Sequence, residues 1–325
     1  MIAVVGEALI DLVVSADGRV DARPGGGPYN AARTLARLGA STAFLGHLSG
    51  DGFGRLLRDR LDAEDVMLGV PAPSAAPSTL AVADVDQAGI ASYAFYLDGT
   101  AGADLTYEEL KAALPAGVTA VHAGTLGLVM EPIGSAIERL ILTDLPAGAL
   151  VMLDPNCRPI AIRDRTAYLR RIERIAARAD VVKASVEDLA YLRPGVSAQE
   201  AASALLAAGS ALATGLGPGA GPALVLVTDG PHPAMAVMPD GIVTAEVPSV
   251  QVADTIGAGD AFGGGFLAWW TAHGLGRTDL KRPELVEAAL RAAAAVAALT
   301  CARPGADPPT LADVRARGWW PEPAS

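Results

Sequence analysis

The order of apolar segments along the chain is the feature that most constrains its fold. Short β-rich apolar runs alternate with longer segments, rich in alanine and leucine, that have helical spacing. Repeated β–α order implies a mainly parallel sheet with helices on both faces, and sites in such folds lie at the carboxyl ends of the strands. We therefore predict an α/β fold with a central, mainly parallel sheet flanked by helices. The predicted strands are residues 2–10, 42–45, 120–123, 150–154, 181–183 and 224–228, and the predicted helices are 30–38, 53–61, 133–142, 168–177, 186–192 and 201–207.

Two regions interrupt this alternation. Residues 13–20 and 80–97 alternate polar and apolar side chains with no helical segment beside them, which is typical of antiparallel strands with one solvated face. Because helical material separates the two regions, the small sheet that they form is expected to be a discontinuous lid over the core. We expect the whole chain, residues 1–325, to form a single domain. The stretch 209–221, rich in Gly, Ala and Pro, is predicted to be a surface connection.

Charge and cysteine content argue against several classes of protein. The net charge is −11, and Lys and Arg are dispersed along the chain, which argues against a nucleic-acid surface. The apolar stretch 292–302 is well short of the roughly 20 residues that a membrane span needs, so no membrane role is expected. Cys157 and Cys301 are too few for a disulfide framework, which favours a cytoplasmic protein. An acidic protein that handles a polyphosphate must attract it locally, through backbone N–H groups, a metal ion or a few basic side chains.

The strongest functional signal is the segment 254–260, Asp-Thr-Ile-Gly-Ala-Gly-Asp. It lies between a strand-like run, residues 242–252, and a segment of helical composition, residues 261–270. This context puts its glycines at a helix N-terminus, where free N–H groups and the positive end of the helix dipole form an anion site. The segment therefore predicts close approach of the backbone to a phosphate group.

Asp260 stands inside this turn, where bound phosphate would repel a carboxylate. A base poised to take a proton from a hydroxyl explains its place, because phosphoryl transfer mainly needs positioning and no large pKa shift. Two alternatives stay open from the residues alone. Asp260 is an acidic residue in the first turn of a helix, or Gly257, Gly259 and Gly263 form a dinucleotide-binding turn. The latter fits poorly, because the segment lies in the last quarter of the chain and no acidic residue ends a strand about 20 residues later.

A second glycine-rich segment, Gly-Gly-Gly-Pro-Tyr-Asn at residues 25–30, precedes a predicted helix. Asn30 can cap this helix or present its amide to a polyol, and the local sequence does not decide between the two. Asp11, at the end of the first predicted strand, is either a simple turn residue or a carboxylate that binds adjacent sugar hydroxyls. These residues are the candidates for a sugar site.

Together the two segments resemble the two signatures of the ribokinase-like (PfkB-type) carbohydrate kinases, in the same order and at a similar separation. Weaker similarities cover nearly the whole chain, and those at residues 6–7, 122–124 and 154–158 are closest to the fructokinase-like branch. The resemblance implies a ribokinase-like fold, a central sheet flanked by helices with a small β lid, and ATP-dependent transfer of a phosphoryl group to a sugar hydroxyl.

The resemblance also implies a role for each matching residue. The catalytic base would be Asp260, with an anion hole made by Gly257, Ala258 and Gly259. The sugar would be held by Asp11, Gly26, Gly27, Asn30 and Arg158. The nucleotide would be bordered by Lys183, Ser185, Thr228, Gly230, Gly257 and Gly259. Glu187 or Asp188 would organise Mg²⁺ through water. Members of the family often bind a monovalent cation through carbonyl groups near the second signature and the turn 303–305, which would place K⁺ beside Asp254.

The substrate is the least constrained part of this prediction. Leu97 stands where fructokinase-like members often carry Arg, which removes a bidentate partner. Fructose is the first expected substrate, 2-keto-3-deoxygluconate the runner-up with Arg158 as the candidate for its carboxylate, and nucleosides come third. A regulator that binds sugar without turnover is the alternative from another class, and Asp260 with its glycines argues against it. The unpaired edges of a lid sheet lead us to expect a homodimer.

Overall fold

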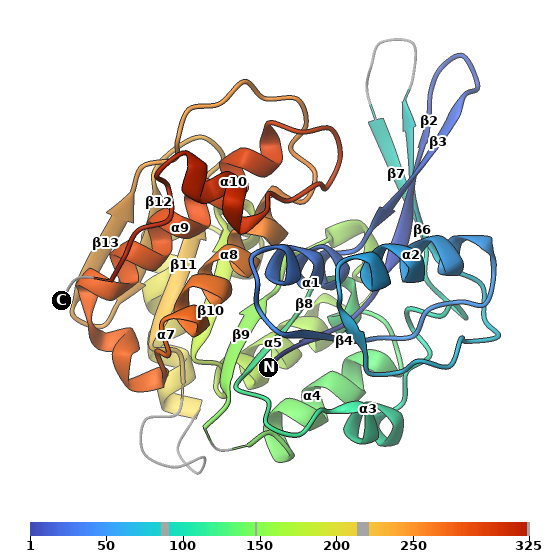
Figure 1. Ribbon diagram of the computed structural model, residues 1–325. Coiled ribbons are helices and arrows are strands. Elements are labelled where there is room, and N and C mark those ends of the chain that lie inside the picture. The colour runs from blue at the N-terminus through green and yellow to red at the C-terminus, as the bar shows by residue number, and fades with distance from the viewer. Residues whose placement is uncertain (86–90, 147, 213–220, 324–325) are drawn as a thin grey trace.

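A nine-stranded, mostly parallel sheet forms the centre of the molecule (Figure 1). The computed structural model describes residues 1–325 except 86–90, 147, 213–220 and 324–325. Neighbouring strands are parallel except that β12 is antiparallel to both β11 and β13. Across the sheet the order is β13 (Gly241–Ala245), β12 (Ala234–Met238), β11 (Leu224–Thr228), β10 (Val181–Ser185), β9 (Leu150–Asp154), β8 (Ala120–Gly124), β1 (Ile2–Val5), β4 (Thr42–Leu45) and β5 (Met67–Leu68).

Helices cover both faces of this sheet, as predicted. Along β1, Ile2 and Val4 join the hydrophobic core on one face, whereas Ala3 and Val5 join the core on the other. A parallel sheet needs apolar side chains on both faces for this reason. The first face is covered by α1 (Gly27–Arg37), α2 (Gly52–Ala63), α8 (Ala258–Ala272), α9 (Pro283–Cys301) and α10 (Leu311–Ala316). The second face is covered by α3 (Tyr107–Ala113), α4 (Ile133–Thr143), α5 (Arg165–Ala176), α6 (Val186–Leu192) and α7 (Ala198–Leu212).

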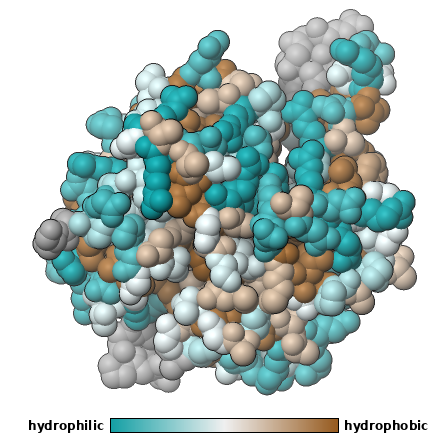
Figure 2. Space-filling model, viewed as in Figure 1, coloured by the Kyte–Doolittle hydropathy of each residue, from teal (hydrophilic) through white to brown (hydrophobic). Residues whose placement is uncertain are grey.

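A separate four-stranded sheet projects from the body beside α1 and α2 (Figure 1). Its central strands β2 and β6 are parallel, and each pairs with an antiparallel edge strand. In order, the strands are β3 (Val20–Gly25), β2 (Leu9–Val14), β6 (Thr79–Val85) and β7 (Ala91–Tyr96). Figure 2 shows this sheet as a protrusion separated from the body by a notch at the top of the view.

The bounds predicted for the first strands are wrong in one respect. Residues 2–10 do not form one strand, because β1 ends at Val5 in the large sheet and β2 begins at Leu9 in the small one. Gly6 makes the break possible: its φ is 148°, and a Cβ there would lie only 2.4 Å from Pro28 Cγ. Residues 13–20 accordingly contain the end of β2, a turn and the first residue of β3, and Asp11 lies within β2.

The segment before α8 also differs from its prediction. The strand-like run 242–252 is a strand only as far as Ala245, and residues 246–257 form neither helix nor strand. By contrast, β4, β9, β11 and α6 have the predicted bounds. Most of the predicted connection 209–221, and part of 80–97, lie outside the described residues. Within the described part of the chain, no helix is both long and apolar enough to cross a membrane.

Candidate active site

The glycine-rich turn of residues 257–259 opens α8, as the sequence predicts. Gly257 is the residue before the helix and has a left-handed backbone, with φ at 76°. A Cβ at this position would lie 2.7 Å from Ala306 Cβ, so both the conformation and the close contact require glycine. Ala258 and Gly259 begin the helix, where N–H groups lack partners within the helix and the dipole is positive. The turn therefore has the geometry of an anion site.

Asp260 lies directly after this turn and is almost fully buried, with 7% of its surface exposed. Burial raises the pKa of its carboxyl group, although the hydrogen bond from Asn30 and the charges of Lys183 and Arg158 oppose the shift. Asn30 Nδ2 donates to Asp260 Oδ2 at 2.9 Å. A carboxylate with a raised pKa, held by one amide, is suited to accept a proton from a nearby hydroxyl.

Asn30 does not cap α1, which answers the question that the sequence left open. The capping position is Gly26, whose φ is 105° and which has no side chain to offer. Besides the bond from its Nδ2 to Asp260, Asn30 has a buried Oδ1 with no hydrogen-bond partner among the described residues. A donor from a bound ligand would satisfy this oxygen.

A cavity of about 780 Å³ lies between the small sheet, the start of α1 and the turn before α8. This volume is within the range of sites for small molecules. The predicted site residues that line it are Asp11, Gly26, Gly27, Asn30, Arg158, Gly257, Gly259 and Asp260. Residues from distant parts of the sequence therefore meet in one place, on the carboxyl side of the large sheet.

Two charged side chains face this cavity beside Asp260. A Cβ on Gly25 would lie 2.0 Å from Asp11 Oδ2, so this glycine leaves the space that the Asp11 carboxylate occupies. Burial and the charge of Asp260 raise the pKa of Asp11 to about 6, against the charges of Arg158 and Arg23. Arg158 is exposed, and its Nη1 donates to the carbonyl of Cys157 at 3.1 Å.

Comparison with known proteins identifies the family of proteins to which this chain is related. Residues 1–313 match the model of the pfkB family carbohydrate kinases. The chain belongs to this family. A fructokinase of Rhizobium leguminosarum bv. trifolii is 37% identical over 272 residues, 82% of this chain and 79% of that protein, and a fructokinase of Vibrio alginolyticus is 31% identical over 307 residues, 93% of each. A crystal structure of fructokinase with bound ATP from Xylella fastidiosa is 29% identical, covers 97% of each chain and superposes with a TM-score of 0.81.

The protein is thus an ATP-dependent carbohydrate kinase with a ribokinase-like fold. This finding removes the two rival interpretations of the sequence, a dinucleotide-binding protein and a regulator without turnover. The chemistry of the family is phosphoryl transfer, in which the protein positions the reactants and neutralises charge.

Lys183 lies behind the anion turn of the kinase, not among the residues that line the cavity. It is 2% exposed, and its Nζ pairs with Asp154 Oδ2 at 3.0 Å. A Cβ on Gly259 would lie 3.0 Å from the same Nζ, so the ammonium group touches the backbone of the turn. Burial lowers the pKa of Lys183, but the charges of Asp154 and other carboxylates outweigh it and raise the pKa. Lys183 therefore stays charged beneath the anion turn.

The residues predicted to border the nucleotide meet at the carboxyl ends of β10 and β11. Ser185 and Thr228 are direct neighbours across these strands, and Gly230 is exposed in the turn that follows. Ser185 also caps α6, because its Oγ accepts a hydrogen bond from the backbone N–H of Asp188 at 3.1 Å. These positions form a partly exposed edge at the carboxyl ends of β10 and β11.

Of the two acidic residues predicted for Mg²⁺, one is committed to the fold. Asp188 is 4% exposed, and its two oxygens accept the backbone N–H groups of Cys157 at 2.6 Å and Ser185 at 2.9 Å. Glu187, next to it, is exposed at the start of α6. No cluster of three or more His, Cys, Asp or Glu side chains suited to a metal ion occurs among the described residues. Only Glu187 of this pair is therefore open to a hydrated metal ion.

Glu7 is a site residue that the sequence analysis did not select. It lines the cavity, is 1% exposed and accepts hydrogen bonds from Gly127 N at 2.7 Å, from Gly27 N at 3.3 Å and from Thr125 Oγ1. Burial raises its pKa to about 7, against these hydrogen bonds. The available signal was a carboxylate within the apolar run at the start of the chain.

We expect Glu7 to make stability depend on pH. Its folded pKa of about 7 exceeds the ordinary 4.5, so its contribution is complete below pH 4.5 and declines as pH rises to about 7. Across this window the free energy of unfolding should fall by up to about 3 kcal/mol. Urea unfolding at several pH values measures this slope. Glu7→Gln should flatten it, whereas a Glu7→Gln profile parallel to that of the wild type would assign the slope to other groups.

Proposed function

We propose that this kinase is a fructokinase, which transfers the γ-phosphoryl group of ATP to a hydroxyl of fructose. The observation that carries the proposal is the cavity in which Asp260 follows the anion turn and Asp11 faces it from the small sheet. The fructokinases among its relatives support the choice of sugar. In this proposal Asp260 takes the proton of the attacking hydroxyl, while the first N–H groups of α8 neutralise the transferred phosphoryl group.

The sugar would be held by polar groups from two sides. Asp11 offers two carboxylate oxygens to adjacent hydroxyls, and Asn30 has its Oδ1 free for one more donor. Gly26 and Gly27 bring the backbone close, since a Cβ on Gly27 would lie 3.1 Å from Asp260 Oδ1 and still nearer to Thr125. The small sheet supplies the wall opposite the anion turn and would act as a lid over the sugar.

ATP would lie along the edge formed by Ser185, Thr228 and Gly230, with its γ-phosphate at the anion turn. Ser185 and Thr228 are partly exposed and Gly230 is exposed, whereas Gly257 and Gly259 line the cavity. Mg²⁺ bound to the phosphates would supply charge neutralisation, and the exposed Glu187 is the residue that fits a contact through water. Asp188 fits a supporting role, because both of its oxygens are already hydrogen-bonded.

A second substrate, 2-keto-3-deoxygluconate, is favoured by one observation. Arg158 lines the cavity, and the hydrogen bonds of its guanidinium to described residues go to the backbone carbonyls of Asn156 and Cys157, so it can also pair with a substrate carboxylate. Fructose has no carboxylate to meet it. We rank this acid second because the curated relatives of this chain include fructokinases from Rhizobium and Vibrio.

Specificity constants decide between these substrates. ADP release from Mg-ATP would be followed with fructose, 2-keto-3-deoxygluconate, ribose, tagatose and adenosine as acceptors. We expect the highest kcat/KM for fructose. A higher value for 2-keto-3-deoxygluconate, lost in Arg158→Met, would replace fructose by the acid; the matched Arg163→Met variant removes an exposed arginine of the same loop and serves as control.

We further propose a homodimer of single-domain chains that works in the cytoplasm. In the described part of the small sheet, β3 and β7 are edge strands, and the nearby Tyr93 and Tyr96 are each more than half exposed. A second copy could cover these edges and side chains. The need for ATP and the two free cysteines support the cytoplasm as the compartment.

A further inference from the structure

The carboxylate of Asp254 is fully engaged by donors of its own chain. Its Oδ1 accepts the backbone N–H of Ile256 at 3.1 Å. Its Oδ2 accepts the backbone N–H of Gly305 at 2.9 Å and Nη1 of Arg23 at 3.2 Å. The family resemblance places a monovalent cation beside Asp254, among carbonyl groups near this segment and the turn 303–305. At the Asp254 carboxylate, however, a guanidinium group and two amides already occupy the oxygens. This donor set does not fit an added cation.

Arg23 is held in this position from two sides. It extends from β3 of the small sheet, and its Nε pairs with Asp21 Oδ2 at 2.7 Å while Nη1 reaches Asp254. Its stem lies over the turn at Gly305, where an added Cβ would come 3.9 Å from Arg23 Cδ. A planar guanidinium with two carboxylate partners is a fixed positive charge. Arg23 therefore connects the small sheet to the segment that leads into the anion turn.

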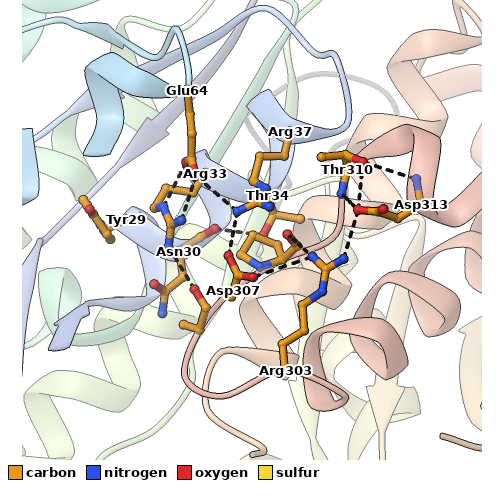
Figure 3. Close-up of polar contacts among 12 residues, drawn as sticks. Tyr29, Asn30, Arg33, Thr34, Arg37, Glu64, Arg303, Asp307, Thr310 and Asp313 are labelled. Atoms are coloured by element: carbon orange, nitrogen blue, oxygen red, sulfur yellow. Dashed lines mark hydrogen bonds and ion pairs between the residues drawn. The ribbon is translucent and has the colours of Figure 1, made fainter. Parts of the chain in front are cut away.

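Two carbonyl groups just after the turn 303–305 also accept hydrogen bonds from arginines. Ala306 O accepts Nη1 of Arg33 at 2.9 Å, and Pro308 O accepts Nη1 of Arg303 at 3.0 Å. Figure 3 shows these guanidinium groups approaching the turn, with Asp307 between Arg303 and Arg37. K⁺ needs several oxygen ligands that face it. Arginine side chains already occupy three of the oxygens near this position, on Asp254, Ala306 and Pro308.

We propose that the Arg23 guanidinium replaces the monovalent cation at Asp254, so that this kinase works without K⁺. Asp254 lies three residues before Gly257, and the bond from its Oδ1 to Ile256 N shapes the approach to the anion turn. Arg23 balances the charge of this carboxylate and is a positioning residue, since it lies among neither the cavity-lining residues nor the anion turn. The inference requires that the chain is a kinase of this family, and it is the same whichever sugar the kinase phosphorylates.

The test replaces K⁺ by tetramethylammonium at constant ionic strength, so that general screening is unchanged. With whichever sugar turns over, we expect kcat/KM of the wild type to change by less than about twofold, because the charge at Asp254 is built in. Thermal unfolding without any substrate gives a second readout: the melting temperature should be equal in the two salts. A wild-type enzyme activated tenfold by K⁺, or stabilised by K⁺ and not by tetramethylammonium, would overturn the proposal.

The Arg23→Met variant tests the converse, that the enzyme responds to K⁺ once the guanidinium group is removed. This change frees Asp254 Oδ2, so we expect kcat/KM to fall about tenfold in tetramethylammonium and to recover partly in K⁺, since a charge-assisted hydrogen bond is lost. The melting temperature of this variant alone should rise with K⁺. Arg19→Met is the matched control, because Arg19 lies in the same hairpin and pairs with Asp17 at the surface. Equal behaviour of Arg23→Met and Arg19→Met in both salts would also overturn the proposal; if Arg23→Met fails to fold, the wild-type comparison still decides.

Discussion

Asp260→Asn should lower kcat by about 10³-fold, which is within the range for loss of a general base. The amide cannot take the proton of the attacking hydroxyl, yet it keeps the size of the carboxylate and an oxygen for the bond from Asn30. Affinity for ATP should be unchanged or higher, because a negative charge beside the phosphates is gone. ADP release and calorimetric titration with ATP measure the two effects separately.

The control for this variant is Asp98→Asn, which removes an exposed carboxylate paired with Arg163. We expect wild-type turnover from it. If Asp260→Asn retained turnover within about threefold of the wild type, Asp260 would not be the base, since a positioned base contributes far more than this. A combined loss of turnover and ATP affinity would instead indicate damage to the anion turn.

Lys183→Met should reduce both rate and stability. The buried ammonium beside the backbone of Gly259 stabilises negative charge at the anion turn, and we expect kcat to fall about 10²-fold without it. The change also leaves Asp154 buried without its partner, which should lower the free energy of unfolding by about 3 kcal/mol or more. Steady-state kinetics and urea unfolding report the two losses.

A double variant separates the two roles of Lys183. Asp154→Asn together with Lys183→Met removes both charges, so most of the stability should return while kcat stays low. Recovery of kcat along with stability would mean that Lys183 acts only through the fold. Asp154→Asn alone keeps the lysine but removes the main charge that raises its pKa, so its turnover should lie between those of the wild type and Lys183→Met.

The sequence was most informative where one local signal determines a structure. The strand 150–154 and the helix 186–192 have clear apolar patterns, and both have the predicted bounds. The segment 254–260 also identified a helix N-terminus correctly, because a left-handed glycine such as Gly257 marks this kind of turn. Elements with their own periodicity or turn chemistry can therefore be predicted without tertiary information.

Errors occurred where contacts between distant residues decide the outcome. The run 2–10 is apolar apart from Gly6 and Glu7, and its pattern does not show that the chain leaves one sheet for another at Gly6, where Pro28 packs closely against the backbone. The sequence left the role of Asn30 open between a helix cap and a ligand contact, and its amide donates to Asp260, 230 residues away. Glu7 was missed because a buried carboxylate has no sequence spacing that identifies its donors.

The pairing of Lys183 with Asp154 could not be predicted from the sequence for a similar reason. The two residues lie on neighbouring strands β10 and β9, and only the order of the sheet brings them together. Likewise, Asp254 was identified as a candidate cation ligand, but nothing in the local sequence predicts that Arg23 reaches it from the small sheet. Side-chain partners across a sheet depend on topology, which the pattern of elements limits but does not determine.

The central claim is that the cavity around Asp260 transfers a phosphoryl group from ATP to a sugar hydroxyl. Phosphorus NMR of the wild-type protein with Mg-ATP and fructose tests it most directly, because it observes both products of the transfer. We predict a sugar-phosphate resonance that grows in step with ADP and is absent with Asp260→Asn. Formation of ADP and inorganic phosphate without a sugar phosphate, for fructose and for every other sugar of the panel, would contradict the account.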